Sequence, residues 1–282
     1  MPDPRQLTSL IKLLDDDSAT VRESVLRELG AFGPDLELEL ARQNVVLGND
    51  DLSVIKCVLE EQRAVWLKEA WPDWFTIDDD KEKLESALSL LAQFMHGRAY
   101  HVSLHQLIER LAEEYITADS HGDARRLACF LFDTTGLKGV HQEEYYNPLN
   151  SSLIHVIEQK RGLPISLACV YILVGNRLGL NVEGINLPGH FLAKCESGGR
   201  SHIIDCYNGG RFLNEEDLAS VQTQVPITMQ NILSLECRSS TIIARVLRNL
   251  VNACQYSLQD GNSHLMFDLL TMMERIDFSS SP

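Results

Sequence analysis

Three polar side chains in the middle of the chain have the types that acyl-transfer chemistry requires. Ser166 lies in R-G-L-P-I-S-L-A, His190 in L-P-G-H-F-L and Asp205 in I-I-D-C-Y-N-G-G-R. A hydroxyl attacks a carbonyl carbon when a histidine takes its proton, and a carboxylate then fixes the tautomer of that histidine. The sequence therefore predicts a nucleophile, a general base and an orienting carboxylate, in that order along the chain.

Ser166 is the candidate nucleophile because we expect it in the first turn of a helix, where Pro164 suits the first position. Unpaired backbone N–H groups and the positive end of the helix dipole would stabilise an oxyanion there. Cys169 is an alternative nucleophile, since it lies three residues later on roughly the same helical face. It also lies within an apolar run, where a free cysteine usually behaves as a small hydrophobic residue.

A structural interpretation also fits the three polar residues. Ser166 would then help to cap its helix, and His190 would bond Asp205 only to hold neighbouring strands together. A serine hydroxyl is a poor nucleophile unless its base is well aligned. On this interpretation the protein is a non-catalytic fold that binds a partner or a ligand in its cleft.

The elements that must position these residues are two helices and three strands. Turn residues, Pro-Gly and Gly-Gly, separate the strands, and glycine ends both helices. We predict helices over 151–160 and 164–179, and strands over 182–187, 190–195 and 201–206. His190 should therefore begin a strand, and Asp205 should lie on the strand that follows.

The first 135 residues indicate helices throughout, because apolar residues recur at helical spacing. The pattern D-x-x-V-R…L-G within residues 17–30 resembles a HEAT-type hairpin, with Ser18 as N-cap and Gly30 as the stop. A single such unit does not make a solenoid. Further helices are predicted over 34–45, 51–70, 79–97, 104–118 and 122–134, and near the end of the chain over 239–258 and 262–275.

These assignments give three predicted domains. Residues 1–80 form a helical HEAT-like prefix, residues 81–235 a core with the candidate site, and residues 236–282 a short helical tail. The expected fold class is α+β and helix-rich, with a small antiparallel sheet in the core. A helical prefix and tail favour protein binding, because helical hairpins commonly present extended binding faces.

Composition limits the function classes. The 282 residues carry a net charge of −15, which argues against a nucleic-acid partner because such binding relies on clustered Lys and Arg. No apolar run is long enough to span a bilayer, and no secretory signal is visible. Seven scattered cysteines suit a reducing cytoplasm. We expect a cytoplasmic protein with a protein partner or peptide substrate, and no cofactor.

A metal site is not expected either. His101 and His105 have the four-residue spacing of zinc ligands on a helix, but A-Y-H-V-S-L-H lacks the glutamate of a zinc peptidase. We interpret them as an exposed pair. The sequence does not fix the oligomeric state.

Residues from about 85 to 225 resemble the SirB-type branch of the transglutaminase-like superfamily. The resemblance rests on Y-Y-N-P-L-N-S-S-L, R-G-L-P-I-S-L, R-L-G-L-N-V-E-G-I-N-L-P-G-H-F-L and I-I-D-C-Y-N-G-G-R. It implies a papain-like α+β core and a tail that resembles the start of a tetratricopeptide-like region. It also implies that His190 and Asp205 match the superfamily histidine and aspartate, while Ser166 stands near the place of its cysteine.

Two functions follow. The first is a non-catalytic or regulatory protein-interaction module, in effect a pseudoenzyme, because serine replaces the expected cysteine. The alternative is a hydrolase or acyltransferase that acts on amide or ester bonds. In that case Ser166 or Cys169 attacks the carbonyl, His190 transfers the proton and Asp205 orients His190.

Overall fold

The computed structural model describes residues 3–119, 122–219, 229–233, 235 and 237–279. These residues belong to two compact units, and each unit is described by itself. Unit 1 comprises Met1–Asp73 and Gln93–His101, and unit 2 comprises Trp74–Ala92 and Val102–Pro282. The predicted HEAT-like prefix, core and tail stay predictions. The end of the predicted tail, residues 280–282, lies outside the described residues.

Unit 1 is helical. Its helices are α1 (Leu7–Lys12), α2 (Ala19–Gly30), α3 (Leu36–Arg42) and α4 (Asn49–Ala70). Ser18 is the N-cap of α2, as predicted, but Gly30 is the last helical residue and Ala31 forms the C-cap. The core of the unit consists of leucine, isoleucine and valine side chains that recur at helical spacing: Leu7, Ile11, Leu14, Val25, Leu29, Leu36, Leu40, Ile55 and Leu59.

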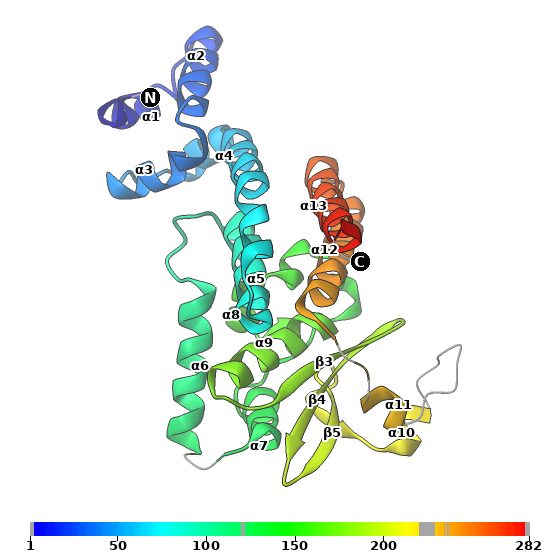
Figure 1. The fold of residues 1–282 in the computed structure, drawn as a ribbon. Helices are drawn as coiled ribbons and strands as arrows, with labels where there is room; N and C mark the ends of the chain where they lie inside the picture. Colours follow the sequence, from blue (N-terminus) through cyan, green and yellow to red (C-terminus); the bar gives the residue numbers. More distant parts are fainter. Residues whose placement is uncertain (1–2, 120–121, 220–228, 234, 236, 280–282) are drawn as a thin grey trace. The chain divides into compact units, whose positions relative to one another are not determined.

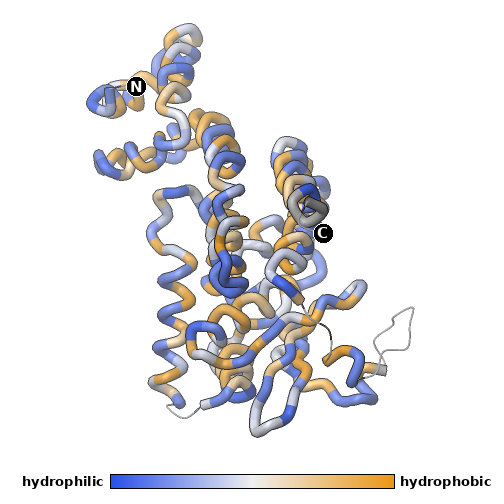
Figure 2. The backbone as a smooth tube through the Cα atoms, in the orientation of Figure 1, coloured by the Kyte–Doolittle hydropathy of each residue, from blue (hydrophilic) through white to orange (hydrophobic). Residues whose placement is uncertain are grey.

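Unit 2 holds most of the remaining helices. They are α5 (Asp80–His96, of which residues from 93 on belong to unit 1), α6 (Leu104–Ala118), α7 (Ala124–Cys129), α8 (Leu153–Gln159), α9 (Pro164–Arg177), α10 (Glu215–Ala219), α11 (Met229–Leu233), α12 (Ser239–Tyr256) and α13 (Asp260–Ser279). Along α6, hydrophobic and hydrophilic residues alternate at helical spacing, which marks one buried and one exposed face (Figure 2).

A four-stranded antiparallel sheet carries the predicted base and carboxylate. Its order is β3–β4–β5–β6, with bounds Val182–Leu187, His190–Ser197, Arg200–Asp205 and Arg211–Leu213. The three predicted strands are confirmed within two residues, whereas β6 was not predicted. Two very short strands, β1 (Lys138–Gly139) and β2 (Arg161–Gly162), pair in parallel and were also missed. The α+β, helix-rich class is confirmed.

Helix α9 packs on β3 and β4 and is buried from Ile165 to Gly175. A helix that is apolar on every side belongs in the interior of a protein. The first turn of α9, with Ser166, therefore lies inside unit 2. In Figure 1 this helix runs through the centre of the unit between the surrounding helices and the sheet.

The last two helices, α12 and α13, lie side by side (orange and red in Figure 1). The buried face of α12 is apolar and includes Ile242, Ile243, Val246, Leu247 and Leu250. This helix also contacts α9, β3 and the short turn at Pro148–Ser151. Among the described residues, no helix has both the length and the apolarity needed to cross a bilayer.

Candidate functional site

Ser166 lies in the first turn of α9, as predicted, and Pro164 occupies the first helical position. The side chain is buried, with 1 % of the residue exposed. Its hydroxyl donates a 2.8 Å hydrogen bond to the backbone carbonyl of Asn150. Asn150 is itself buried, and its Nδ2 donates to the carbonyl of Glu144 at 2.6 Å. The hydroxyl proton of Ser166 is thus directed at a structural carbonyl.

His190 and Asp205 meet on neighbouring strands. His190 begins β4 and Asp205 ends β5, so the antiparallel pairing brings them to the same edge of the sheet. Nε2 of His190 lies 3.7 Å from Oδ2 of Asp205, which is longer than a hydrogen bond. The histidine side chain is partly exposed at 27 %, whereas the carboxylate is buried. The expectation that these two side chains lie together therefore agrees with the structure.

The carboxylate of Asp205 is held by the residues that follow it. Its Oδ1 accepts hydrogen bonds from the backbone N–H groups of Tyr207 (3.1 Å) and Asn208 (3.2 Å). Its Oδ2 accepts one from Nδ2 of Asn208 at 2.7 Å. Sequence reasoning assigned Asn208 only to a turn. The sequence did contain an indication of this contact, because an aspartate shortly before N-G-G is typical of a turn that the aspartate side chain caps.

Tyr207 fixes this turn against the rest of unit 2. Its hydroxyl donates to the carbonyl of Val140 at 2.7 Å, and its carbonyl accepts from the N–H of Gly139 at 3.0 Å. The ring lies so close to Gly139 that a Cβ there would be 2.5 Å from it. The short strand β1 therefore serves to seat Tyr207 beside Asp205.

Cys169 lies one turn further into α9 and is fully buried. Burial raises the pKa of its thiol far above the ordinary value, so the sulfur stays protonated at neutral pH. A protonated, inaccessible thiol neither attacks a carbonyl nor binds a metal. Cys206 is buried in the same way, and burial also raises its pKa. Both side chains fit the hydrophobic interpretation of a buried free cysteine.

The structure thus brings two of the predicted site residues together. In the described part of the chain, no hydrogen bond joins Ser166 to His190, and the serine hydroxyl is engaged elsewhere. Across the described ranges there is also no group of three or more His, Cys, Asp or Glu side chains that could hold a metal ion.

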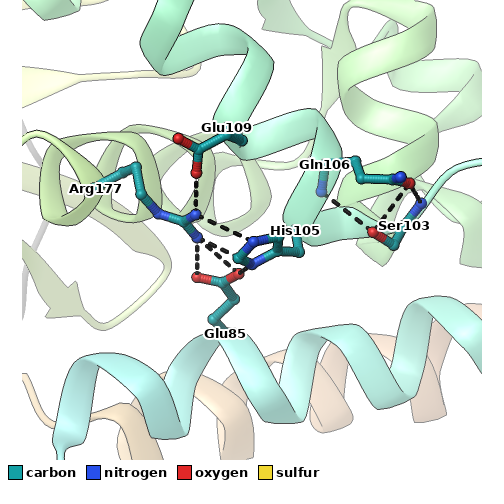
Figure 3. Close-up of polar contacts among 6 residues, drawn as sticks. All are labelled: Glu85, Ser103, His105, Gln106, Glu109 and Arg177. Atoms are coloured by element: carbon teal, nitrogen blue, oxygen red, sulfur yellow. Dashed lines mark hydrogen bonds and ion pairs between the residues drawn. The ribbon is translucent and has the colours of Figure 1, made fainter.

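A second polar centre lies away from the sheet edge, around Arg177 at the end of α9 (Figure 3). Nη2 of Arg177 donates to both carboxylate oxygens of Glu85, at 3.0 and 2.9 Å, and Nη1 donates to Glu109. Nδ1 of His105 lies 3.0 Å from Oε1 of Glu85. A cavity of about 670 Å³ opens beside this cluster and is lined mainly by polar residues, including Lys81, Glu85, His105, Asn176 and Arg177.

His101 and His105 do not share a helix, and both are exposed, as the sequence interpretation expected. Helix α6 begins at Leu104, after the N-cap Ser103, so His101 precedes the helix. Ser103 and Gln106 form a reciprocal capping box, which explains why the helix starts there (Figure 3). His105 lies beside the guanidinium of Arg177, with its Nδ1 3.3 Å from Nη2.

Comparison with known proteins supports the resemblance at the level of the superfamily. A sequence profile described as the transglutaminase-like superfamily matches residues 98–248, more than half of the chain. A UPF0162 protein of Xylella fastidiosa is 33 % identical over 193 residues, which cover 64 % of this chain and 68 % of that protein. A UPF0162 protein of Vibrio cholerae is 26 % identical over 113 residues, or 39 % and 41 % of the two chains.

A shorter match links the chain to a much larger protein. F-box only protein 21 of Mus musculus is 33 % identical over 78 residues, which make up 28 % of this chain and 12 % of that protein. No solved structure matches the chain.

Proposed function

Because this chain belongs to the transglutaminase-like superfamily, we propose that it is a non-catalytic member that binds a peptide segment of a partner protein beside His190. The observation that carries the proposal is the state of Ser166. Its hydroxyl is 1 % exposed and donates to the carbonyl of Asn150. A nucleophile must reach both its base and the substrate, and this hydroxyl is engaged away from the base.

The histidine and the carboxylate are present at the site, but no accessible attacking group lies beside them in the described part of the chain. Asp205 is fixed by Tyr207 and Asn208, and His190 is partly exposed at the sheet edge. Such a rigid polar edge suits recognition of a peptide, whose amides both donate and accept hydrogen bonds. The match to 12 % of F-box only protein 21 shows that a similar segment also occurs within a larger protein.

The alternative is an acyl-transfer enzyme with Ser166, His190 and Asp205. The contact of 3.7 Å between His190 and Asp205 favours it, because a histidine backed by a carboxylate is the arrangement of a general base. It requires the Ser166 hydroxyl to leave Asn150 and become accessible. Under either function, we also propose that the chain belongs to the SirB-type branch. Its first helices would form a HEAT-like prefix and its last helices a tetratricopeptide-like tail.

Turnover separates the two functions. The purified chain and its His190→Ala variant would be incubated with a p-nitrophenyl ester, and with a blocked glutamine dipeptide plus hydroxylamine. We expect both proteins to show the same rate, equal to the background rate measured with heat-denatured protein in the same buffer. A rate that exceeds this background and is lost in His190→Ala would overturn the non-catalytic proposal and favour the acyl-transfer mechanism.

Binding is tested with peptides displayed from a random library and selected on the immobilised chain. We expect an enriched sequence pattern whose binding weakens in Tyr146→Ala, because this exposed ring packs against Tyr145, which interacts electrostatically with Tyr207 beside Asp205. Phe267, an aromatic residue on α13, is 57 % exposed against 44 % for Tyr146, so Phe267→Ala is the matched control and should bind the same peptides unchanged. Selection that enriches no pattern would count against the interaction module.

A further inference from the structure

Arg245, on α12, is a half-buried cation for which the described part of the chain supplies no neutralising carboxylate. The groups that act electrostatically on its guanidinium are Tyr145, Cys237 and Arg248, and none of them is an anion at neutral pH. Burial lowers the pKa of Arg245, and Arg248 lowers it further. Charged groups that are partly withdrawn from water normally have an opposite charge nearby. Arg245 therefore has an unmet preference for an anion.

The guanidinium is held in one orientation. Its Nη1 donates to the carbonyl of Leu187 at 2.6 Å and to Oδ1 of Asn186. Its Cζ lies 5.6 Å from the centre of the Phe191 ring, a cation–π distance. Within the described residues, Nε and Nη2 donate to no protein acceptor. That edge of a guanidinium is the one that binds two oxygens of a carboxylate or phosphate side by side.

Arg245 is anchored next to the candidate site. Leu187, whose carbonyl it binds, pairs with His190 across the β3–β4 hairpin. Tyr145 acts electrostatically on Arg245 and on Tyr207, the residue that seats Asp205. No hydrogen bond of the Tyr145 hydroxyl is found among the described residues, and the side chain is 36 % exposed. Tyr145 is thus a second donor without an acceptor in the part of the chain that the structure describes, close enough to Arg245 for the two groups to interact electrostatically.

Two further tyrosines extend this surface. The rings of Tyr146 and Tyr256 stack with centroids 4.6 Å apart, and Tyr146 meets Tyr145 edge to face at 5.5 Å. Tyr146 and Tyr256 are 44 % and 70 % exposed. Exposed aromatic rings grouped beside an arginine are typical of peptide-binding surfaces. We call Tyr145, Tyr146, Arg245 and Tyr256 the α12 patch.

The local charge differs from that of the whole chain. The chain carries −15, yet α12 holds Arg245 and Arg248 and no acidic residue. Arg248 pairs with Glu274 at 3.5 Å, so it is already compensated, whereas Arg245 is not. An acidic group would therefore meet one uncompensated positive charge at the α12 patch.

We propose that the α12 patch binds an oxyanion of the peptide that the candidate site recognises, with Arg245 as the bidentate donor and Tyr145 as the second. This inference rests on the proposed function and names the chemical class of the partner, a peptide with an acidic side chain or phosphate. The stacked tyrosines cover the apolar part of that peptide.

The test compares blocked pentapeptides that differ at one position. The first peptide carries a tyrosine followed by glutamate. The second has glutamine in place of that glutamate, and the third has phosphoserine there. Dissociation constants are measured by NMR titration of the full chain at low salt. We expect the glutamate or phosphoserine peptide to bind about 10-fold more tightly than the glutamine peptide, as for a charge-assisted hydrogen bond. Whichever of the two anionic peptides binds more tightly identifies the group that the subsite prefers, a carboxylate or a phosphate.

Variants locate the effect. Arg245→Gln should reduce the preference to about twofold or less, while Arg248→Gln, three residues away on the same helix, should keep it. Because Arg245 packs on the buried ring of Phe191, Arg245→Gln could disturb the core. Tyr145→Phe is a second variant that removes only the hydroxyl of an exposed residue and leaves the core unchanged. It should weaken only the anionic peptides, by about threefold to fivefold.

The outcomes separate this inference from the proposed function. Equal affinity for charged and uncharged peptides, or a preference that survives Arg245→Gln, would overturn the anion subsite and leave peptide binding intact. Absence of binding by all three peptides would overturn both. Loss of the preference in Arg248→Gln alone would place the anion on the exposed arginine and contradict the assignment to Arg245.

Discussion

The imidazole of His190 and the carboxylate of Asp205 lie at one edge of the sheet, with 3.7 Å between Nε2 and Oδ2. The carboxylate does not depend on the histidine for its position. Three N–H groups from Tyr207 and Asn208 bind its two oxygens. Asp205 is therefore a structural anchor of the turn that follows β5, and it is held in place whether or not His190 carries a proton.

Asn208 should consequently matter for stability. Asn208→Ala removes the 2.7 Å hydrogen bond to a carboxylate oxygen that is buried with 5 % of the residue exposed. We expect the free energy of unfolding to fall by about 1–3 kcal/mol, the range for a lost hydrogen bond to a buried charged group. Urea denaturation followed by circular dichroism measures it. Asn262→Ala, whose amide bonds an exposed neighbour, is the control and should change the value by less than about 0.5 kcal/mol.

Ser166 should likewise behave as a structural residue. Ser166→Ala leaves the carbonyl of Asn150 without the donor that now lies 2.8 Å away, inside the protein. We expect a loss of about 1–3 kcal/mol in unfolding free energy, with unchanged peptide binding.

A second substitution at this position examines access to the helix start. In Ser166→Cys the sulfur would lie where the hydroxyl is buried, so we expect iodoacetamide to label it at least about 10-fold more slowly than exposed Cys57. Mass spectrometry of the digested protein gives both rates in one sample. Labelling of position 166 as fast as that of Cys57 would show that the helix start opens to solvent, and would revive the acyl-transfer mechanism.

The sheet could be predicted because its signals are local. Strands β3, β4 and β5 are short segments rich in apolar residues, and the turns between them contain glycines with positive φ, Gly189, Gly198 and Gly199. Strand β6 spans Arg211–Leu213, and β1 and β2 span two residues each. Segments this short show no periodicity, and their pairing depends on partners that are distant in sequence.

The site was predictable only in part, for the same reason. That His190 and Asp205 meet follows from two consecutive antiparallel strands. That Ser166 bonds Asn150, 16 residues earlier, depends on how the turn before α8 packs on α9. Arg245 binds the carbonyl of Leu187, 58 residues earlier in the chain, and no local pattern indicates this contact.

The cluster around Arg177 gives a prediction for tertiary stability (Figure 3). The arginine is mostly buried, at 22 % exposure, and binds Glu85 through two hydrogen bonds and Glu109 through another. Arg177→Met would leave Glu85, also 22 % exposed, without its cation. We expect a loss of about 1–3 kcal/mol in unfolding free energy, between the values for exposed and fully buried pairs.

Arg248→Met is the matched control for Arg177→Met in the same urea experiment. Its pair with Glu274 is more than half exposed on both sides, so the change should stay below about 1 kcal/mol. Equal effects of the two substitutions would mean that burial of the Arg177 cluster contributes no stability.

Because several thiols are buried, we expect the free energy of unfolding to fall at alkaline pH. Burial raises the pKa of Cys254, near the end of α12, from 9.0 to about 11. The folded protein therefore holds this proton more tightly than the unfolded chain does. Its stabilising contribution is complete below pH 9 and is lost as the pH rises toward 11, because in that window only the unfolded chain ionises. Each pH unit within the window costs up to about 1.4 kcal/mol for one such group.

Urea denaturation at pH 7.5, 9 and 10.5, with a reductant present, measures this loss. In Cys254→Ala the cavity lowers the unfolding free energy equally at every pH, but the decline between pH 9 and 10.5 should be shallower than in the unaltered protein. Cys57→Ala removes a thiol that is exposed in the folded protein as well, and should leave the decline unchanged. If the stability of Cys254→Ala declines as steeply as that of the unaltered protein, the alkaline loss comes from other groups.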